Sequence, residues 1–156
     1  MAKFKKKAFR TWLDVLTKVV VKARDDYTCQ RCGKKLIPGD NNTQWCHIKS
    51  RKSNQWRWDL NDAITMCGSC HATTTDNPDE FGIWFKEKWP ARHEHINTPY
   101  KPRTWKEQDY KDVEAYLLEK AIELEVDFMH VPTSSGYRAR FCRRIKEFQD
   151  RKEGNL

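Results

Sequence analysis

Apolar residues near the start of the chain recur at intervals of three and four positions, which is the period of an amphipathic helix. This pattern predicts a helix over about residues 9–25, with a core-facing side formed by Phe9, Trp12, Leu13, Leu16, Val20 and Ala23. The same period predicts a long helix over residues 105–126, with a face formed by Val113, Tyr116, Leu117, Ala121 and Leu124. A shorter, basic helix is predicted over residues 137–152.

The middle of the chain alternates short apolar runs with turn residues. Residues 36–46 predict a short strand, a Pro-Gly-Asp-Asn-Asn turn and a second strand that leads into His47. Further on, Asn77 is suited to cap a helix that has Pro78 at its first position. The inward face of that helix is formed by Phe81, Trp84 and Phe85.

Mixed signals of this kind indicate the α+β class. The domain most clearly marked is a small central one over residues 26–90. It is flanked by a basic N-terminus and helix over residues 1–25, and by a connector, an acidic helix and a basic C-terminal helix over residues 91–156.

Charged residues are gathered in blocks. The chain has 30 basic and 22 acidic residues, which gives a net charge of +8. Residues 1–10 hold five cations and no acid, residues 49–57 hold four cations and no acid, and residues 137–152 hold seven cations and two acids. Residues 105–127 instead hold eight acids and three cations. Such separation favours a polyanionic partner, most simply nucleic acid, over solvated surface charge with no partner.

The chain has six cysteines, which are informative about its cellular compartment and about metal binding. The chain has no apolar run that could span a membrane, and its basic N-terminus lacks the apolar segment of a secretory signal, so we expect a reducing cytoplasm. Cys29, Cys32, Cys67 and Cys70 form two C-x2-C pairs, the spacing of a four-thiolate structural zinc site. A redox role would require a βαβ context, and haem attachment at CGSCH would require export, so zinc is favoured.

Two histidines are positioned by these cysteine pairs. His47 lies within the 34 residues that separate the pairs, and His71 directly follows Cys70. If four thiolates complete the zinc site, both imidazoles are free for another task. A general base together with a divalent cation is what phosphodiester hydrolysis requires. The alternative is that His47 is a hydrogen-bonded structural residue.

Three segments, YTCQRCGKK, WCHIKSR and WDLNDAITMCGSCH, resemble the HNH, or ββα-metal, nuclease family in its zinc-stabilised form. That family includes phage recombination proteins of the NinG/Rap type and recombination endonuclease VII. The resemblance covers residues 9–90 well and the acidic helix loosely. It implies a small zinc-stabilised ββα-metal domain with flanking N- and C-terminal helices. It also implies a metal-dependent DNA endonuclease for recombination, DNA processing or homing, in the host cytoplasm if phage-encoded.

The resemblance also implies roles for individual residues. The four paired cysteines hold the structural zinc, His47 activates the water, and His71 ligates a catalytic cation, either Mg²⁺ or Mn²⁺, or else Ni²⁺ or Zn²⁺. Cys46 occupies the position of a second cation ligand, although a thiol is matched poorly to magnesium. Asp62 stands where the family has its central Asn, and Asn61 precedes it. Either side chain could brace the loop that carries His47.

A basic and aromatic loop follows His47 and is expected to contact the DNA backbone and to stack on bases; its residues are Lys49, Arg51, Lys52, Trp56 and Arg57. The departures at Cys46, Asp62 and Thr75 leave open a zinc protein that binds DNA, or assists recombination, without cutting. A third possibility is a protein that docks a partner, or a second copy of itself, through the acidic helix over residues 105–126.

Overall fold

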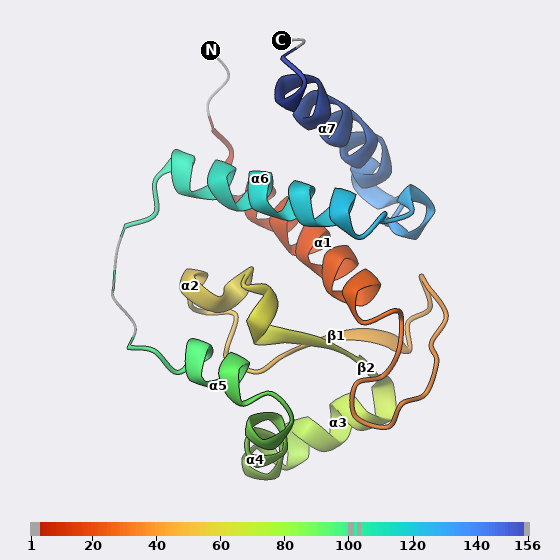
Figure 1. Ribbon diagram of the computed structural model, residues 1–156, viewed down its shortest axis with the longest axis vertical. Coiled ribbons are helices and arrows are strands. Elements are labelled where there is room, and N and C mark those ends of the chain that lie inside the picture. Colours follow the sequence, from red (N-terminus) through yellow and green to blue (C-terminus); the bar gives the residue numbers. More distant parts are fainter. Residues whose placement is uncertain (1–3, 100–101, 103, 155–156) are drawn as a thin grey trace.

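The structure, a computed structural model, describes residues 4–99, 102 and 104–154. In this part of the chain, seven α-helices surround one sheet of two antiparallel strands, an arrangement compatible with the expected α+β class (Figure 1). The helices are α1 (Lys6–Arg24), α2 (Asn54–Arg57), α3 (Gly68–Asp76), α4 (Pro78–Lys88), α5 (Pro90–Ile96), α6 (Glu107–Glu123) and α7 (Tyr137–Lys152). The strands are β1 (Thr43–His47) and β2 (Ala63–Cys67), and three 3-10 turns are η1 (Leu60–Asp62), η2 (Phe128–His130) and η3 (Ser134–Gly136).

A helical layer is formed by α1, α6 and α7, with α6 crossing α1 (Figure 1). The predicted inward face of α1 is confirmed, because Trp12, Leu13, Leu16 and Val20 are fully buried. They lie in one core cluster with side chains of α6, of α7 and of the segment between those helices. Burial of such side chains stabilises each by about 1.5–3 kcal/mol relative to an exposed position.

The inward face of α6 includes a carboxylate. Glu114 is 1% exposed and accepts hydrogen bonds from Trp12 Nε1 at 2.6 Å and from Arg144 Nη2 at 2.5 Å. The predicted face is confirmed for residues 117 and 121 but wrong for Tyr116 and Leu124, which are 43% and 37% exposed. These two positions turn outward because α1 and α7 pack against the side of the helix that carries Glu114.

The sheet pairs β1 with β2, with Thr43 opposite Cys67 and His47 opposite Ala63. Every residue of β2 is buried. The expectation of a strand directly after residue 36 was wrong, since only an isolated bridge, Thr28 to Lys35, forms in that region. The turn residues that follow break the extended backbone there, and β1 finds its partner further along the chain.

A second layer packs on the sheet and consists of α3, α4 and α5 (Figure 1). Its core cluster is separate from that of the helical layer and includes Ile64, Met66, Phe81, Phe85 and Ile96. The predicted start of α4 at Pro78 is confirmed, with Asn77 at the cap position but without a side-chain hydrogen bond there. Neither α3 nor α5 was predicted.

Two guanidinium groups join the layers at one stretch of backbone. Arg24 of α1 donates to the carbonyl oxygens of Leu60 and Ala63, at 2.5 and 2.7 Å. Arg92 of α5 donates to the carbonyls of Asn61 and Ala63, at 3.0 and 2.9 Å. The entrance to β2 is therefore held from both sides. None of the described helices is long and apolar enough to cross a membrane.

Candidate functional site

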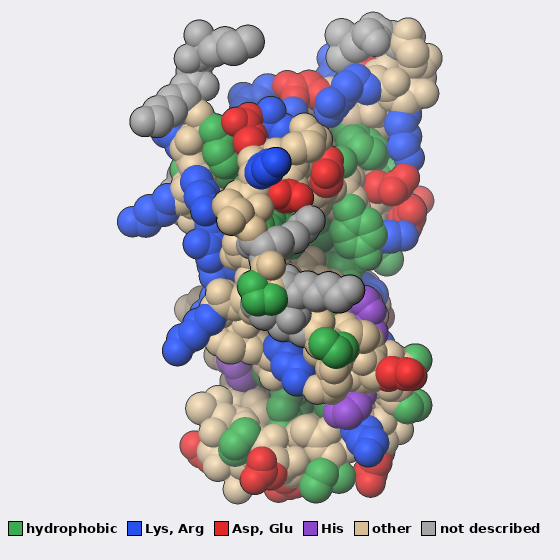
Figure 2. All heavy atoms as spheres, turned by 90° about the vertical axis from the view of Figure 1, so that its left-hand side faces the viewer, with side chains coloured by type: hydrophobic (Ala, Val, Ile, Leu, Met, Phe, Trp, Pro, Cys, Tyr) green, Lys and Arg blue, Asp and Glu red, His purple; other side chains and the backbone are tan. Residues whose placement is uncertain are grey.

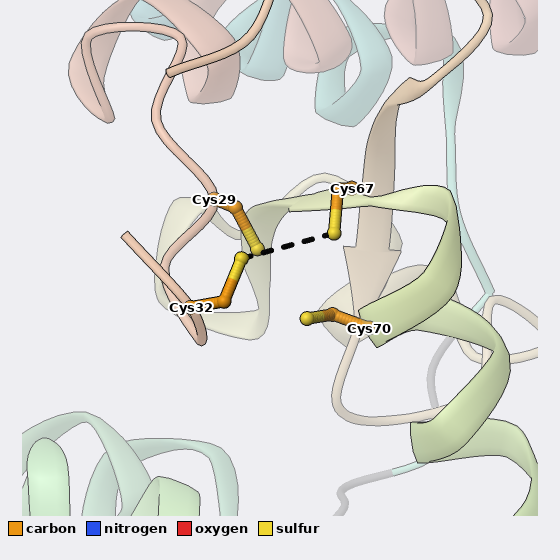
Figure 3. A group of neighbouring side chains, drawn as sticks. All are labelled: Cys29, Cys32, Cys67 and Cys70. Carbon is orange, nitrogen blue, oxygen red and sulfur yellow. Dashed lines mark hydrogen bonds between the residues drawn. The ribbon is translucent and has the colours of Figure 1, made fainter. Parts of the chain in front are cut away.

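The four paired cysteines converge on one point from three elements. Cys29 and Cys32 come from the turn after α1, Cys67 ends β2, and Cys70 lies in the first turn of α3, and their side chains point toward one another (Figure 3). All four sulfur atoms lie within 4.8 Å of one another, so the group could hold a zinc ion. The backbone at Gly33 has a φ of +75°, a left-handed conformation that the tight turn after Cys32 requires.

The geometry and the chemistry of this group both fit zinc. Zinc–thiolate bonds of about 2.3 Å in a tetrahedron place the sulfur atoms about 3.8 Å apart. The distance between Cys32 Sγ and Cys67 Sγ is 3.9 Å. Burial opposes ionisation of Cys67, but hydrogen bonds to the Ser69 hydroxyl and the Cys70 backbone N–H outweigh it and lower the pKa of the thiol to about 6. A thiolate, the form that binds zinc, is therefore favoured there at neutral pH.

His47 ends β1, and its tautomer follows from its hydrogen bond. Its Nε2 lies 3.2 Å from the carbonyl oxygen of Arg57. A carbonyl only accepts, so Nε2 carries the hydrogen and Nδ1 presents a lone pair. The position of that carbonyl is fixed in turn, because the Arg57 guanidinium donates two hydrogen bonds to Asp14 of α1, at 2.8 and 2.6 Å.

The imidazole of His47 is uncharged at neutral pH. Burial lowers its pKa to about 4, although the hydrogen bond to Arg57 acts in the opposite direction. The Trp45 ring packs against it, with ring centroids 4.0 Å apart. His47 therefore has the free lone pair and the neutral ring of a general base over a wide pH range, although a pKa of about 4 makes it a weaker base than an ordinary imidazole.

His71 lies in α3 and is held by β1. Its Nδ1 is 2.5 Å from Oε1 of Gln44, so Nδ1 is the donor and Nε2 keeps a lone pair. Burial lowers the pKa of His71, and the charge of Arg51 acts in the same direction. His47 and His71 both line one cavity, as the sequence analysis requires of a base and a cation ligand.

Cys46 faces away from that cavity. Successive side chains of a strand point to opposite faces, so Cys46 lies against α3, with Sγ 4.0 Å from the Thr74 hydroxyl. It is 2% exposed, and burial raises its pKa to about 11. A buried, neutral thiol is a poor ligand for a hard cation, so this environment favours a packing role.

Of the two residues expected to brace the backbone around His47, Asp62 does so and Asn61 does not. Oδ1 of Asp62 accepts from the Lys49 backbone N–H at 2.6 Å, two residues beyond the histidine. Asn61 instead bonds to its neighbour, with Nδ2 donating to Asp59 Oδ1 at 3.1 Å. Asp62 is fully buried, and its Oδ2 has no hydrogen-bond partner within the described part of the chain.

The cavity that contains His47 has a volume of about 930 Å³. Basic side chains from three parts of the chain line it, namely Lys18, Lys22, Lys49, Arg51 and Arg138. Asp40 is the only acidic side chain among its described lining residues. The sequence analysis missed Lys18, Lys22 and Arg138, because only the fold brings α1 and α7 beside β1. The spacing of the two lysines, one helical turn apart on the polar side of α1, was the available signal.

Two further hollows extend the basic surface beyond the cavity. The cavity and the first hollow share Ser50 and Arg51, and the first and second hollows share Arg10 and Arg57. The remaining basic lining residues of these hollows are Lys6, Lys7 and Lys52. Figure 2 shows Lys and Arg side chains gathered along the left edge of that view, apart from most acidic side chains. The basic surface is thus a continuous track.

The loop residues expected to contact DNA differ in availability. Arg51 and Lys52 are exposed, and Lys49 Nζ donates to Asn97 at 2.6 Å. Much of the charge of Arg57 is neutralised by its two bonds to the Asp14 carboxylate. The expectation that Trp56 stacks on bases was wrong, because this ring is 7% exposed and packs in the core of the second layer.

A set of ligands for the expected catalytic cation is not assembled. Among the described residues, the four cysteines form the only group of three or more His, Cys, Asp or Glu side chains close enough to bind a metal. Mg²⁺ and Mn²⁺ prefer carboxylate and water oxygens, which the lining of the cavity does not supply as a set. The Nε2 of His71 is a single imidazole donor, which suits Zn²⁺ or Ni²⁺ better.

In comparisons with known proteins, no family model, no curated protein and no solved structure matches the chain. The functional assignment therefore depends on the site itself.

Proposed function

We propose that this protein is a zinc-stabilised DNA endonuclease of the HNH type, in which His47 is the general base. The observation that supports this most directly is the state of His47, a neutral imidazole with a lone pair on Nδ1 that lines a cavity rich in lysine and arginine. A structural histidine requires its hydrogen bond but requires no cationic cavity around it. Phosphodiester hydrolysis requires a neutral base and positive charge around the phosphate.

The order of elements supports the same class. A β-strand ending in His47, a basic loop, a second strand and a helix carrying His71 follow one another. One cysteine pair precedes the first strand, and the other lies where the second strand meets the helix. This is the succession that a ββα-metal domain needs. The Lys49 N–H bond of Asp62 corresponds to the loop brace expected at that position.

The proposed step uses the chain's own groups. Nδ1 of His47 accepts a proton from a water molecule. The oxygen of this water forms a bond to phosphorus while the bond from phosphorus to the leaving oxygen breaks. Arg51 and Lys49 attract the phosphate and offset the negative charge that develops on it. A divalent cation, if His71 holds one, would stabilise the leaving oxygen.

A second candidate is a protein that binds DNA without cutting it. The absence of a three-ligand cation group beyond the cysteines, within the described residues, favours this interpretation. Both candidates use the basic track, and only the endonuclease uses the base.

Cleavage assays on supercoiled, single-stranded and branched DNA, with Mg²⁺, Mn²⁺, Ni²⁺ or Zn²⁺ added, separate the two. The parent protein should cut under at least one condition, and His47→Ala should cut about 10²–10⁴-fold more slowly while still binding DNA. His93→Ala is the matched control, because His93 lies on α5 and does not line the cavity. Equal cutting by His47→Ala would refute His47 as the general base, and binding without cutting by the parent would refute the endonuclease and establish the second candidate.

A further inference from the structure

Two lysines on α1 face the cavity without a carboxylate partner. Lys18 and Lys22 are one helical turn apart and both line the cavity. Within the described part of the chain, neither makes an ion pair with an acidic side chain, and Lys18 Nζ lies 6.0 Å from the centre of the Trp45 ring. Burial lowers the pKa of Lys22 to about 8, and the charge of Lys18 acts in the same direction. Two neighbouring positive charges of this kind destabilise the folded protein, and a bound anion would offset their repulsion.

The opposite wall of the cavity adds a third cation. This wall is residues 129–133, and Arg138 of α7 holds it by donating to the carbonyl oxygens of Met129 at 2.7 Å and Val131 at 3.2 Å. Carbonyl groups do not neutralise a guanidinium charge. A hydrogen bond of 2.8 Å between the Tyr27 hydroxyl and Nδ1 of His130 fastens the wall to the turn that follows α1. The two walls therefore present three cations to one space.

We propose that Lys18, Lys22 and Arg138 form a phosphate-binding subsite that holds a single nucleic-acid strand inside the cavity. This inference depends on the proposed function for the identity of its ligand, because the bound strand would be the one whose phosphate lies next to His47. The Trp45 ring lies between the subsite and the base, because it contacts His47 and lies near Lys18. The subsite would thus take a phosphate that neighbours the one being cut.

The size of the cavity favours one strand over a duplex. A volume of 930 Å³ equals that of a cube about 10 Å on a side. The major groove of B-form DNA alone is about 12 Å wide, so a whole duplex needs more room than this volume provides, whereas one strand needs less. A strand that leaves the cavity past Arg51 would meet the outer basic hollows, where Lys6 and Lys7 lie.

Binding of a 12-nucleotide single strand to the zinc-loaded full chain, measured by fluorescence anisotropy over a range of salt, tests the subsite. The His47→Ala background prevents cutting and keeps binding separate from catalysis. Adding Lys22→Met or Arg138→Met should weaken binding several-fold and lower the salt slope by about 0.7 for each phosphate that the protein no longer neutralises. Lys86→Met removes the same charge from an exposed position on α4 and should leave the slope nearly unchanged. An equal effect of Lys22→Met and Lys86→Met would overturn the subsite.

Further measurements in the same experiment identify the ligand and exclude misfolding of the variants. Lys22→Met should be no less stable than its background in thermal unfolding, because it removes a half-buried charge that has no partner. A duplex of equal length should respond less to Lys22→Met, and an equal response would overturn the single-strand assignment. Inorganic phosphate that binds alone with the same dependence on Lys22, while the strand does not, would also overturn it. If the parent protein never cuts but Lys22-dependent strand binding persists, the endonuclease fails and the subsite stands.

Discussion

Replacement of Asp62 by Asn should change how the stability of the protein depends on pH. Asp62 is fully buried, one of its oxygens accepts the Lys49 N–H, and the other has no hydrogen-bond partner among the described residues. Burial raises its pKa from the ordinary value of 3.8 to about 8, against the opposing effect of the Lys49 hydrogen bond. The carboxyl group is therefore mostly protonated in the folded protein at neutral pH.

The sign of the effect follows from proton binding. Between pH 3.8 and about 8 the folded state holds a proton on Asp62 that the unfolded state has lost. Stability must then fall as pH rises through this window, by up to about 1.36 kcal/mol for each pH unit. Across the whole window the loss has a ceiling of about 6 kcal/mol.

Asp62→Asn keeps the shape of the side chain and an oxygen for Lys49, but it cannot ionise. The variant and the parent should have similar stability near pH 4, and the variant should gain an advantage that grows to several kcal/mol by pH 8. Urea unfolding of zinc-saturated protein at several pH values measures this difference at constant slope. The zinc ligands titrate identically in both proteins, so their contribution cancels.

Asp76→Asn is the matched control, because Asp76 is exposed at the end of α3. It should show no advantage that grows with pH. If the difference between Asp62→Asn and the parent stayed constant from pH 5 to pH 8, or changed in the opposite direction, the reasoning about the buried carboxyl would be refuted.

Three other predictions follow from the site and the core. Chelation of zinc should abolish cooperative unfolding of the cysteine-containing layer, because the binding energy of structural zinc contributes directly to folding. Metal analysis together with circular dichroism checks this, and an unchanged unfolding transition in zinc-free protein would contradict it. Glu114→Ala should lower the free energy of unfolding by about 3–5 kcal/mol, because Arg144 and Trp12 lose their acceptor, whereas exposed Glu123→Ala should cost less than about 1 kcal/mol in the same urea titration. Cleavage should fall below about pH 5, where His47 becomes protonated, and a rate profile with its acid limb near 6.5 would argue against His47 as the base.

The sequence was informative wherever a local pattern determines the outcome. The apolar period of α1 and the basic run of α7 predict those helices well, because each helix buries its own stripe. The two C-x2-C pairs likewise predict a four-cysteine group. In contrast, α3 has no apolar face, with only Thr74 buried, and its position follows from the cysteine group and β2 rather than from its own residues.

The parts that could not be predicted depend on distant partners. Glu114 is buried because Trp12, 102 positions away, and Arg144 complete its hydrogen bonds, and no local rule reveals that pairing. Trp56 was expected on the surface because its neighbours are basic, yet its ring enters the core beside the sheet. The low pKa of His47 likewise comes from burial, which the chain order does not show.

The separation of the two core clusters has a consequence for assembly during synthesis. The cluster around the sheet draws all its buried residues from positions 29–96, whereas the cluster of the helical layer joins α1 to Trp58, Leu60 and Ala63 and to residues 110–141. Contacts of high sequence separation form late, and N-terminal units fold first as the chain leaves the ribosome. The metal-bearing half can therefore close while α1 still lacks α6 and α7. Until those helices have been made, α1 exposes an apolar stripe, and this nascent intermediate is the species most in need of a chaperone.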